Sequence, residues 1–248
     1  MKPLISFEHF KAFIDHQLKP QPHGPEAPRK PFVTISRQAG AGGSTVSELL
    51  VAWLGSRTNS GEWTVFDKAL AEKVAEDNAL PRRITAYLTE AKRNFIESTV
   101  EELLGLHPPI ETLVEQTART ILNLAQMGNV ILIGRAANLI TAKLPQGFHV
   151  RLIGSVEKRT IQLANLHGLT FREATQMMKL LDQGRRAYAK NYYHADLENP
   201  MHYHMVINTD LVSFNRAAEI IGQEVMIRMP ILTKPHLPFL EASNQARL

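Results

Sequence analysis

A glycine-rich segment, Ser36 to Thr45, carries the residue types from which proteins build phosphate-binding loops. It follows the β-prone run 32–35 and precedes an amphipathic helical pattern, so it is expected to join a strand to a helix. Glycines allow backbone N–H groups to approach an anion closely, and the positive amino-terminal end of the helix favours negative charge. The segment therefore predicts a site for the phosphates of a nucleotide.

This loop departs from the usual pattern, G-x-x-x-x-G-K-[ST], at two positions. Arg37 stands at the position of the first glycine, and Gly43 at that of the phosphate-binding lysine. Ser44 stands where the loop hydroxyl binds Mg²⁺, and Thr45 where a second hydroxyl meets phosphate. Taken alone, the motif is equally compatible with a plain glycine turn. The predicted nucleotide-binding residues are Arg37, Gly40, Ala41, Gly42, Gly43, Ser44 and Thr45, with Ser44 as the magnesium ligand.

Asp67 and Lys68 follow a second strand-like run, 63–66. The carboxyl ends of the strands are the edge at which open α/β sheets bind their ligands. There Asp67 could orient the acceptor or a magnesium-bound water, and Lys68 could bind a phosphate. Lys68 is the first candidate to replace the missing loop lysine, with Arg37 as its competitor. The alternative is that Asp67 only caps the following helix.

Strands and helices must alternate to position these residues. Five strand-like runs, at 32–35, 63–66, 130–133, 149–153 and 204–208, are separated by helical patterns, which predicts a parallel sheet covered on both faces. Ser155 is expected to cap one helix, and Thr170 with Glu173 another. We expect a short helix and a proline-rich linker at 1–30, the main domain at 31–229 with its last helix ending before Pro230, and an irregular tail at 230–248.

Four ordered motifs give the chain a resemblance to a known family. They are Ile35 to Gly43, Phe66-Asp67-Lys68, Gly134 to Asn138, and Asn208-Thr209-Asp210. Together they resemble the cytidylate kinase-like family, a branch of the P-loop nucleoside monophosphate kinases that shares this lysine-less loop. We therefore expect a three-layer α/β/α P-loop fold with a five-stranded parallel sheet of order 2-3-1-4-5. A helical acceptor-binding insertion is expected at about 68–127 and a lid at about 180–193.

The resemblance also implies roles for three arginines. In the monophosphate kinases the arginine comparable to Arg135 grips the acceptor phosphate, a task that suits the planar guanidinium fork. Arg185 and Arg186 fall where these kinases carry a mobile lid that closes on the transferring phosphoryl group. A surface salt bridge and a solvated basic helix face are the respective alternatives. Ala136 replaces the aspartate of cytidylate kinases proper, which puts selectivity for cytosine in doubt.

Composition sets wider bounds. The chain of 248 residues has a formal charge of +4, 44% hydrophobic residues and no cysteine, which excludes disulfides and thiol catalysis. No run of apolar residues is long enough to span a membrane, and no signal peptide is evident, so a cytoplasmic location is expected. His194, His202 and His204 are interpreted as structural, because no third metal ligand is apparent. Nucleic-acid binding lacks a basic stripe and ranks low.

The function expected from these residues is Mg²⁺-dependent transfer of a phosphoryl group from ATP to a nucleoside monophosphate or a related small acceptor. Asp67, Lys68, Arg135, Arg185 and Arg186 form the expected catalytic set. The competing hypothesis is a non-catalytic nucleotide-binding or sensing protein with a degenerate loop, which the absent lysine favours. The ordered arginines favour the enzyme.

Overall fold

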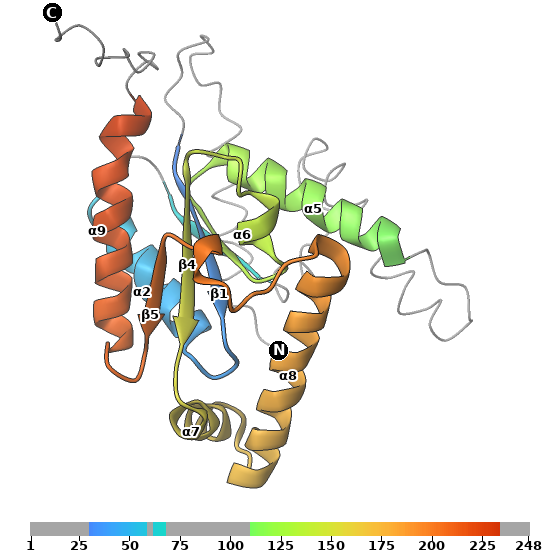
Figure 1. Cartoon of the computed structure of the whole chain (residues 1–248). Helices are drawn as coiled ribbons and strands as arrows, with labels where there is room; N and C mark the ends of the chain where they lie inside the picture. Colours follow the sequence, from blue (N-terminus) through green and yellow to red (C-terminus); the bar gives the residue numbers. More distant parts are fainter. Residues whose placement is uncertain (1–29, 59–61, 68–109, 234–248) are drawn as a thin grey trace, which may run out of the picture.

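The structure is a computed structural model and describes residues 30–58, 62–67 and 110–233 (Figure 1). The predicted helix and linker at 1–30, apart from the last residue, lie outside the described residues. So do Lys68 and the part of the predicted helical insertion that precedes Ile110.

Five parallel strands form one sheet in the order β2-β3-β1-β4-β5. The central strand β1 (Phe32–Arg37) pairs with β3 (Val130–Ile133) and with β4 (Gly147–Ile153), while β2 (Thr64–Phe66) and β5 (Met205–Asn208) lie outermost. Every residue of β3 is buried, as expected for a central parallel strand covered on both faces. The predicted five-stranded parallel sheet and its strand order are confirmed.

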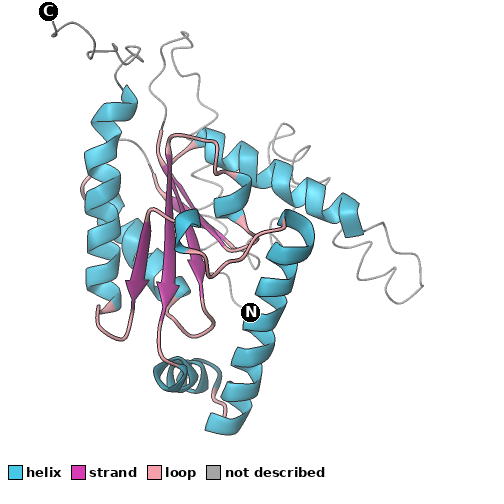
Figure 2. Ribbon diagram, in the orientation of Figure 1, coloured by secondary structure: helices cyan, strands magenta, loops and turns pink. Residues whose placement is uncertain are grey.

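Helices cover both faces of this sheet (Figure 2). α2 (Gly43–Gly55) and α9 (Phe214–Thr233) pack on one face, where Val33 and Ile35 of β1 contribute to the core. α5 (Ile110–Met127) and α6 (Ala137–Ile140) pack on the other face, where Phe32 joins the core. The alternation of successive β1 side chains between the two cores follows from the period of two residues along a strand.

Two further helices form a hairpin that extends past the carboxyl ends of the strands (Figure 1). They are α7 (Val156–His167) and α8 (Phe171–Tyr193). The predicted caps are confirmed: the Ser155 hydroxyl accepts a bond from the Lys158 N–H at 3.3 Å, and Thr170 and Glu173 form a complete capping box. The hairpin is thus fixed by local sequence signals at both of its helix starts.

The end of the last helix differs from the prediction. α9 runs through Pro230 to Thr233, so the irregular tail does not begin at Pro230. A proline inside a helix lacks the N–H that would bond to the fourth carbonyl before it. One missing bond this close to the carboxyl end does not stop the helix.

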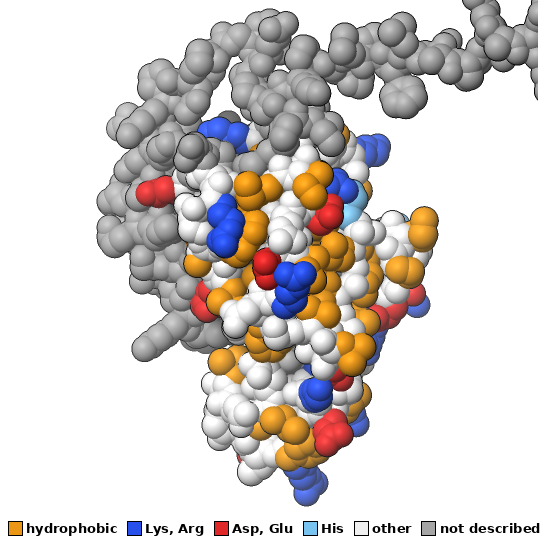
Figure 3. All heavy atoms as spheres, turned by 90° about the vertical axis from the view of Figure 1, so that its left-hand side faces the viewer, with side chains coloured by type: hydrophobic (Ala, Val, Ile, Leu, Met, Phe, Trp, Pro, Cys, Tyr) orange, Lys and Arg blue, Asp and Glu red, His pale blue; other side chains and the backbone are white. Residues whose placement is uncertain are grey.

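On the face that α9 and α2 form, basic side chains are scattered among hydrophobic ones (Figure 3). This face therefore gives no support to nucleic-acid binding through a basic stripe. Among the helices of the described ranges, none combines the length and the hydropathy that crossing a membrane requires.

A buried histidine in β4 links the sheet to β5. His149 is 5% exposed, and its Nδ1 lies 2.9 Å from the Thr34 hydroxyl. Its ring centroid lies 5.0 Å from that of His204, whose Nδ1 accepts a bond from the His149 backbone N–H at 3.0 Å. Burial, and then repulsion by His204 and Arg228, lower the pKa of His149 to about 4. Histidines 149 and 204 are thus part of the packing.

Acid should destabilise the protein through His149. In the unfolded chain the imidazole takes up a proton near pH 6.5, whereas the folded state resists protonation down to about pH 4. Stability is therefore retained above pH 6.5 and lost as the pH falls toward 4, by on the order of 3 kcal/mol at about 1.4 kcal/mol per pKa unit. Urea unfolding at pH 7 and pH 4.5 should show a smaller loss in His149→Gln than in the wild type. The exposed His167→Gln should behave as the wild type, and equal losses in all three proteins would contradict the assignment.

Candidate active site

The loop between β1 and α2 is a tightly packed glycine turn. Gly40 and Gly42 have φ angles of 79° and 78°, in the left-handed region that side chains disfavour. A Cβ atom on Gly40 would overlap the backbone carbonyl of Arg159, and one on Gly42 would overlap the ring of Phe214. The turn therefore requires glycine at both positions, for its dihedral angles and for its close contacts.

The amino-terminal end of α2 is open to an anion. This helix of 13 residues has no side-chain cap and no acidic residue in its first turn. The hydroxyls of Ser44 and Thr45 lie in that turn, partly buried, and bond to none of the residues in the described ranges. Unpaired N–H groups and the helix dipole attract negative charge at such an end.

Arg37 crosses the space that a loop lysine would need. Its side chain passes over Gly43, where a Cβ would lie 2.9 Å from the Arg37 Cγ. Its guanidinium reaches Gly134 after β3, where a Cβ would overlap the Arg37 Nη1. Glycine at both positions thus makes room for the arginine. This packing explains why the loop has Gly43 in place of lysine.

Arg37 lies among charges of both signs, two arginines and two aspartates. Burial, followed by repulsion from Arg185 and Arg135, lowers its pKa to about 9, while Asp67 and Asp182 act in the opposite direction. The group remains protonated at neutral pH. Its guanidinium has no hydrogen-bond partner among residues 30–58, 62–67 and 110–233, although the charges of Asp67 and Asp182 attract it.

Arg135 lies in a strained turn at the end of β3. Gly134, Arg135 and Ala136 have φ angles of 76°, 54° and 55°, and the Ala137 N–H closes the turn by bonding to the Gly134 carbonyl at 3.0 Å. A left-handed conformation costs a non-glycine residue roughly 1–2 kcal/mol. The Arg135 side chain is exposed and lies within electrostatic range of Arg37. Non-glycine residues with left-handed backbone conformations are found preferentially at functional sites.

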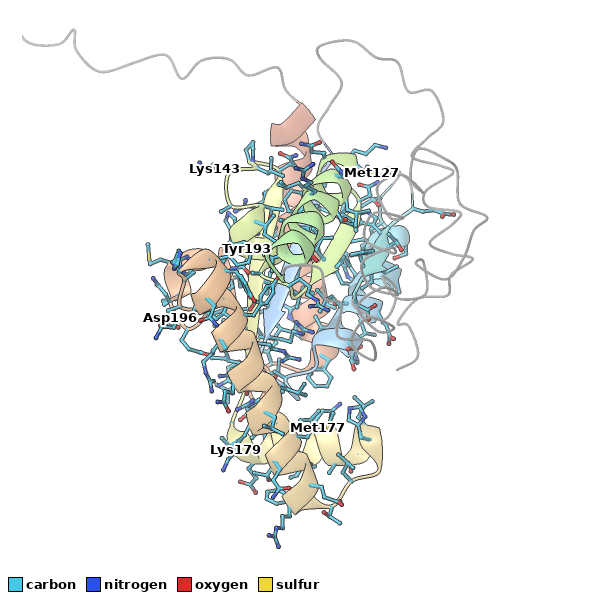
Figure 4. All side chains as sticks on the ribbon, turned by 90° about the vertical axis from the view of Figure 1, so that its right-hand side faces the viewer. Met127, Lys143, Met177, Lys179, Tyr193 and Asp196 are labelled. Carbon is cyan, nitrogen blue, oxygen red and sulfur yellow. The ribbon has the colours of Figure 1, made fainter. Side chains whose placement is uncertain are left out.

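The predicted lid segment, 180–193, is the second half of α8 and continues the same helix (Figure 4). Arg185 donates a hydrogen bond to the Arg37 carbonyl at 3.1 Å, so its guanidinium holds the loop backbone. Arg186 is exposed, with no ion pair to any described residue. The sequence analysis assigned these two arginines the same role in a lid. In the structure, Arg185 contacts the loop and Arg186 faces solvent.

Asp67 follows β2, partly buried and within electrostatic range of Arg37. It therefore lies at the same edge as the loop, as predicted, whereas Lys68 is outside the described residues. No cluster of three or more potential metal-ligating His, Asp or Glu side chains occurs in the described part of the chain.

Residues to which the sequence analysis gave no role also support the site. Asp210 accepts a bond from the Ser155 N–H at 2.9 Å, so the Asn208-Thr209-Asp210 motif ties β5 to the start of α7. Arg151, in β4 and 4% exposed, donates to the Ser36 hydroxyl at 3.0 Å and pairs with Glu198 at 2.6 Å. The sequence signal that could have identified Arg151 is its charge, because it lies within the otherwise strand-like run 149–153.

Comparison with known proteins was consistent with this geometry. A model of the cytidylate kinase-like family matches residues 32–211. An uncharacterized protein from Eubacterium ventriosum ATCC 27560 has a similar structure, with a TM-score of 0.60 and 20% identity over 81% of this chain and 100% of that chain. Shikimate kinase from Acinetobacter baumannii, solved in complex with shikimate, has a TM-score of 0.43 and 14% identity over 80% and 94% of the two chains. At 20% identity the first likeness establishes the fold alone. No curated protein sequence matches.

Proposed function

Because this chain belongs to the cytidylate kinase-like family, we propose that it transfers the γ-phosphoryl group of ATP to a nucleoside monophosphate or a related small acceptor. The observation that carries the proposal is the Arg37 side chain beside the open end of α2. It passes over Gly43, and its guanidinium has no hydrogen-bond partner among the described residues. A polyphosphate bound there would pair with this guanidinium and with the N–H groups at the start of α2.

In the proposed complex the loop from Gly40 to Thr45 binds the ATP phosphates through backbone N–H groups. Arg37 takes the place of the loop lysine at the outer phosphates, with Lys68 as the competing cation. Arg135 binds the acceptor, and Arg186 neutralises charge on the transferring group. Arg185, through its bond to the Arg37 carbonyl, holds the loop. Positioning and electrostatic stabilisation supply most of the catalysis in phosphoryl transfer, so no strong general base is required.

The residues present suit Mg²⁺ bound together with phosphate. This ion commonly takes one or two protein ligands and completes its shell with substrate phosphates and water. The free hydroxyl of Ser44 is the proposed protein ligand, with Asp67 placed to orient a coordinated water. When bound, the ion would neutralise charge on the two outer phosphates of ATP.

A non-catalytic nucleotide-binding protein is the alternative, and Gly43 at the lysine position favours it. Such a protein has no use for a second phosphate contact across the site. The strained turn that holds Arg135 near Arg37 favours the kinase, because strain persists where function requires it.

ATP with Mg²⁺ should raise the melting temperature of the protein. At a nucleotide concentration 100 times Kd the stabilisation is about 2.7 kcal/mol, or several degrees for a domain of this size. Gly42→Asp should abolish the increase, because a Cβ at this position would overlap the ring of Phe214 and force the loop out of its phosphate-binding shape. Gly168→Asp is the matched control: Gly168 also has a positive φ, 64°, but lies in open space at the end of α7. A wild type that shows no increase at millimolar ATP would refute the nucleotide site.

The acceptor is identified by a screen of nucleoside monophosphates with ATP and Mg²⁺, measured as ADP release. Turnover of at least one acceptor supports the kinase. ATP binding without turnover of any acceptor would support the non-catalytic alternative.

A further inference from the structure

One residue of the phosphate loop is held at both of its peptide groups by side chains from the α7–α8 hairpin. The Ala39 N–H donates to Oδ1 of Asp182 at 2.7 Å, and the Ala39 carbonyl accepts from Nη1 of Arg159 at 3.0 Å. Ala39 is 2% exposed. A loop peptide fixed on both sides has little freedom to change conformation.

The two side chains that hold Ala39 also bind each other. Nη1 of Arg159 lies 2.7 Å from Oδ2 of Asp182, so each carboxylate oxygen serves a different partner. Nε of Arg159 donates to the Gly154 carbonyl at 3.0 Å, which ties the pair to the end of β4. The Arg159 and Asp182 side chains are 8% and 11% exposed. Water therefore screens this pair little.

The backbone of Arg159 completes the arrangement. Its carbonyl lies so close to Gly40 that any side chain at that position would overlap it. One turn after Asp182, Arg185 donates to the Arg37 carbonyl. The hairpin thus contacts the loop backbone at three positions, Arg37, Ala39 and Gly40.

We propose that Arg159 and Asp182 are positioning residues that hold the loop in its phosphate-binding shape before nucleotide arrives. This inference rests on the proposed nucleotide site. In the proposed complex the backbone N–H groups of the loop bind the phosphates together with Arg37, so the shape of the loop backbone matters for recognition. Preorganising those groups lowers the ordering cost of binding. The pair binds the loop backbone and needs no contact with the nucleotide.

The test compares Asp182→Asn with Glu219→Gln in the full-length protein. Asparagine keeps an oxygen that can accept from Ala39 but removes the charge that pairs with Arg159 at 2.7 Å and with Arg185 at 3.7 Å. Glu219 forms an Arg–carboxylate pair of the same length, 2.7 Å, with Arg216 on α9, where both side chains are solvent-exposed to a large extent. Two quantities are measured: the Kd for MgATP, and the hydrogen-exchange rate of the Ala39 amide without nucleotide. Arg159→Lys, which keeps the charge but not the several donors of the guanidinium, is a second variant.

Asp182→Asn and Arg159→Lys should each raise the Kd for MgATP by about 10-fold or more and speed Ala39 exchange, whereas Glu219→Gln should leave both unchanged. A variant that only melts earlier, with wild-type Kd and wild-type Ala39 exchange, would show that the pair is structural and overturn the proposal. If the wild type does not bind MgATP, the proposed function fails separately. The exchange rates then decide the positioning role: faster exchange in the two variants supports it, and unchanged exchange refutes it.

Discussion

Arg37→Met is expected to lower kcat for phosphoryl transfer by about 100- to 1000-fold, the effect of removing one charge-stabilising group from a transition state. ATP affinity should fall much less, because charge on the transferring group develops mainly in the transition state. Methionine keeps an unbranched stem that fits between Gly43 and Gly134. It also removes a buried charge, together with repulsion from Arg185 and Arg135 and attraction to Asp67 and Asp182, so stability without nucleotide should not fall.

Steady-state kinetics with the acceptor from the screen measure this effect. Arg216→Met, on the exposed surface of α9, is the control for a lost arginine. Lys68→Met in the same assay tests the competing cation. If Arg37→Met, Lys68→Met and the double variant all keep the wild-type kcat, neither Arg37 nor Lys68 replaces the loop lysine.

The packing of Arg37 adds a sharper comparison. Gly43→Lys alone should be damaging, because the new Cβ would lie 2.9 Å from the Arg37 Cγ. Combined with Arg37→Gly, the same lysine meets no arginine and the loop regains the usual pattern. If the two side chains compete for the same space, the double variant should be more active than either single variant. Additive losses would show that the two side chains do not compete for space.

Arg135→Gly is expected to separate stability from function. The KM for the acceptor should rise by about 10- to 150-fold, equivalent to the roughly 1.5–3 kcal/mol of a charged hydrogen bond, while the Kd for ATP stays unchanged. The free energy of unfolding should rise by roughly 1 kcal/mol, because glycine adopts the φ of 54° without strain. A substitution that stabilises the fold and impairs the reaction would show that Arg135 is kept for its chemistry.

Ala136→Gly is the matched control, since Ala136 has a φ of 55° in the same turn. It should gain stability with little change in KM. An Arg135→Gly protein with the wild-type KM for its acceptor would contradict the phosphate-binding role and favour the non-catalytic alternative.

Local patterns were sufficient to predict the layers of the fold. β3 coincides with the apolar run 130–133, because a strand buried on both faces must be apolar throughout. Ser155 and the pair Thr170 and Glu173 fixed two helix starts through contacts within four residues. β1 extends two residues beyond its apolar run, to Arg37, since pairing with β4 continues there.

The parts of the site that sequence reasoning missed depend on contacts between distant segments. Asp182 bonds to an amide 143 positions earlier in the chain, and Arg159 to a carbonyl 120 positions earlier. No periodicity or motif encodes such pairs. The steric conflict between Arg37 and a side chain at position 43 was missed for the same reason. It depends on the path of the Arg37 side chain, which runs over Gly43 to Gly134 in a distant segment.

The order of the strands has a consequence for synthesis on the ribosome. β1 is the first strand of the described residues, yet it lies at the centre of the sheet, and Thr34 lies 115 positions before its partner His149. At about 5–20 residues per second, β1 waits about 6–23 s after it is made before β4 exists. For most of that time neither neighbouring strand is complete, because β3 ends only at Ile133. The central part of the sheet can therefore close only late in translation, around a strand that emerged early.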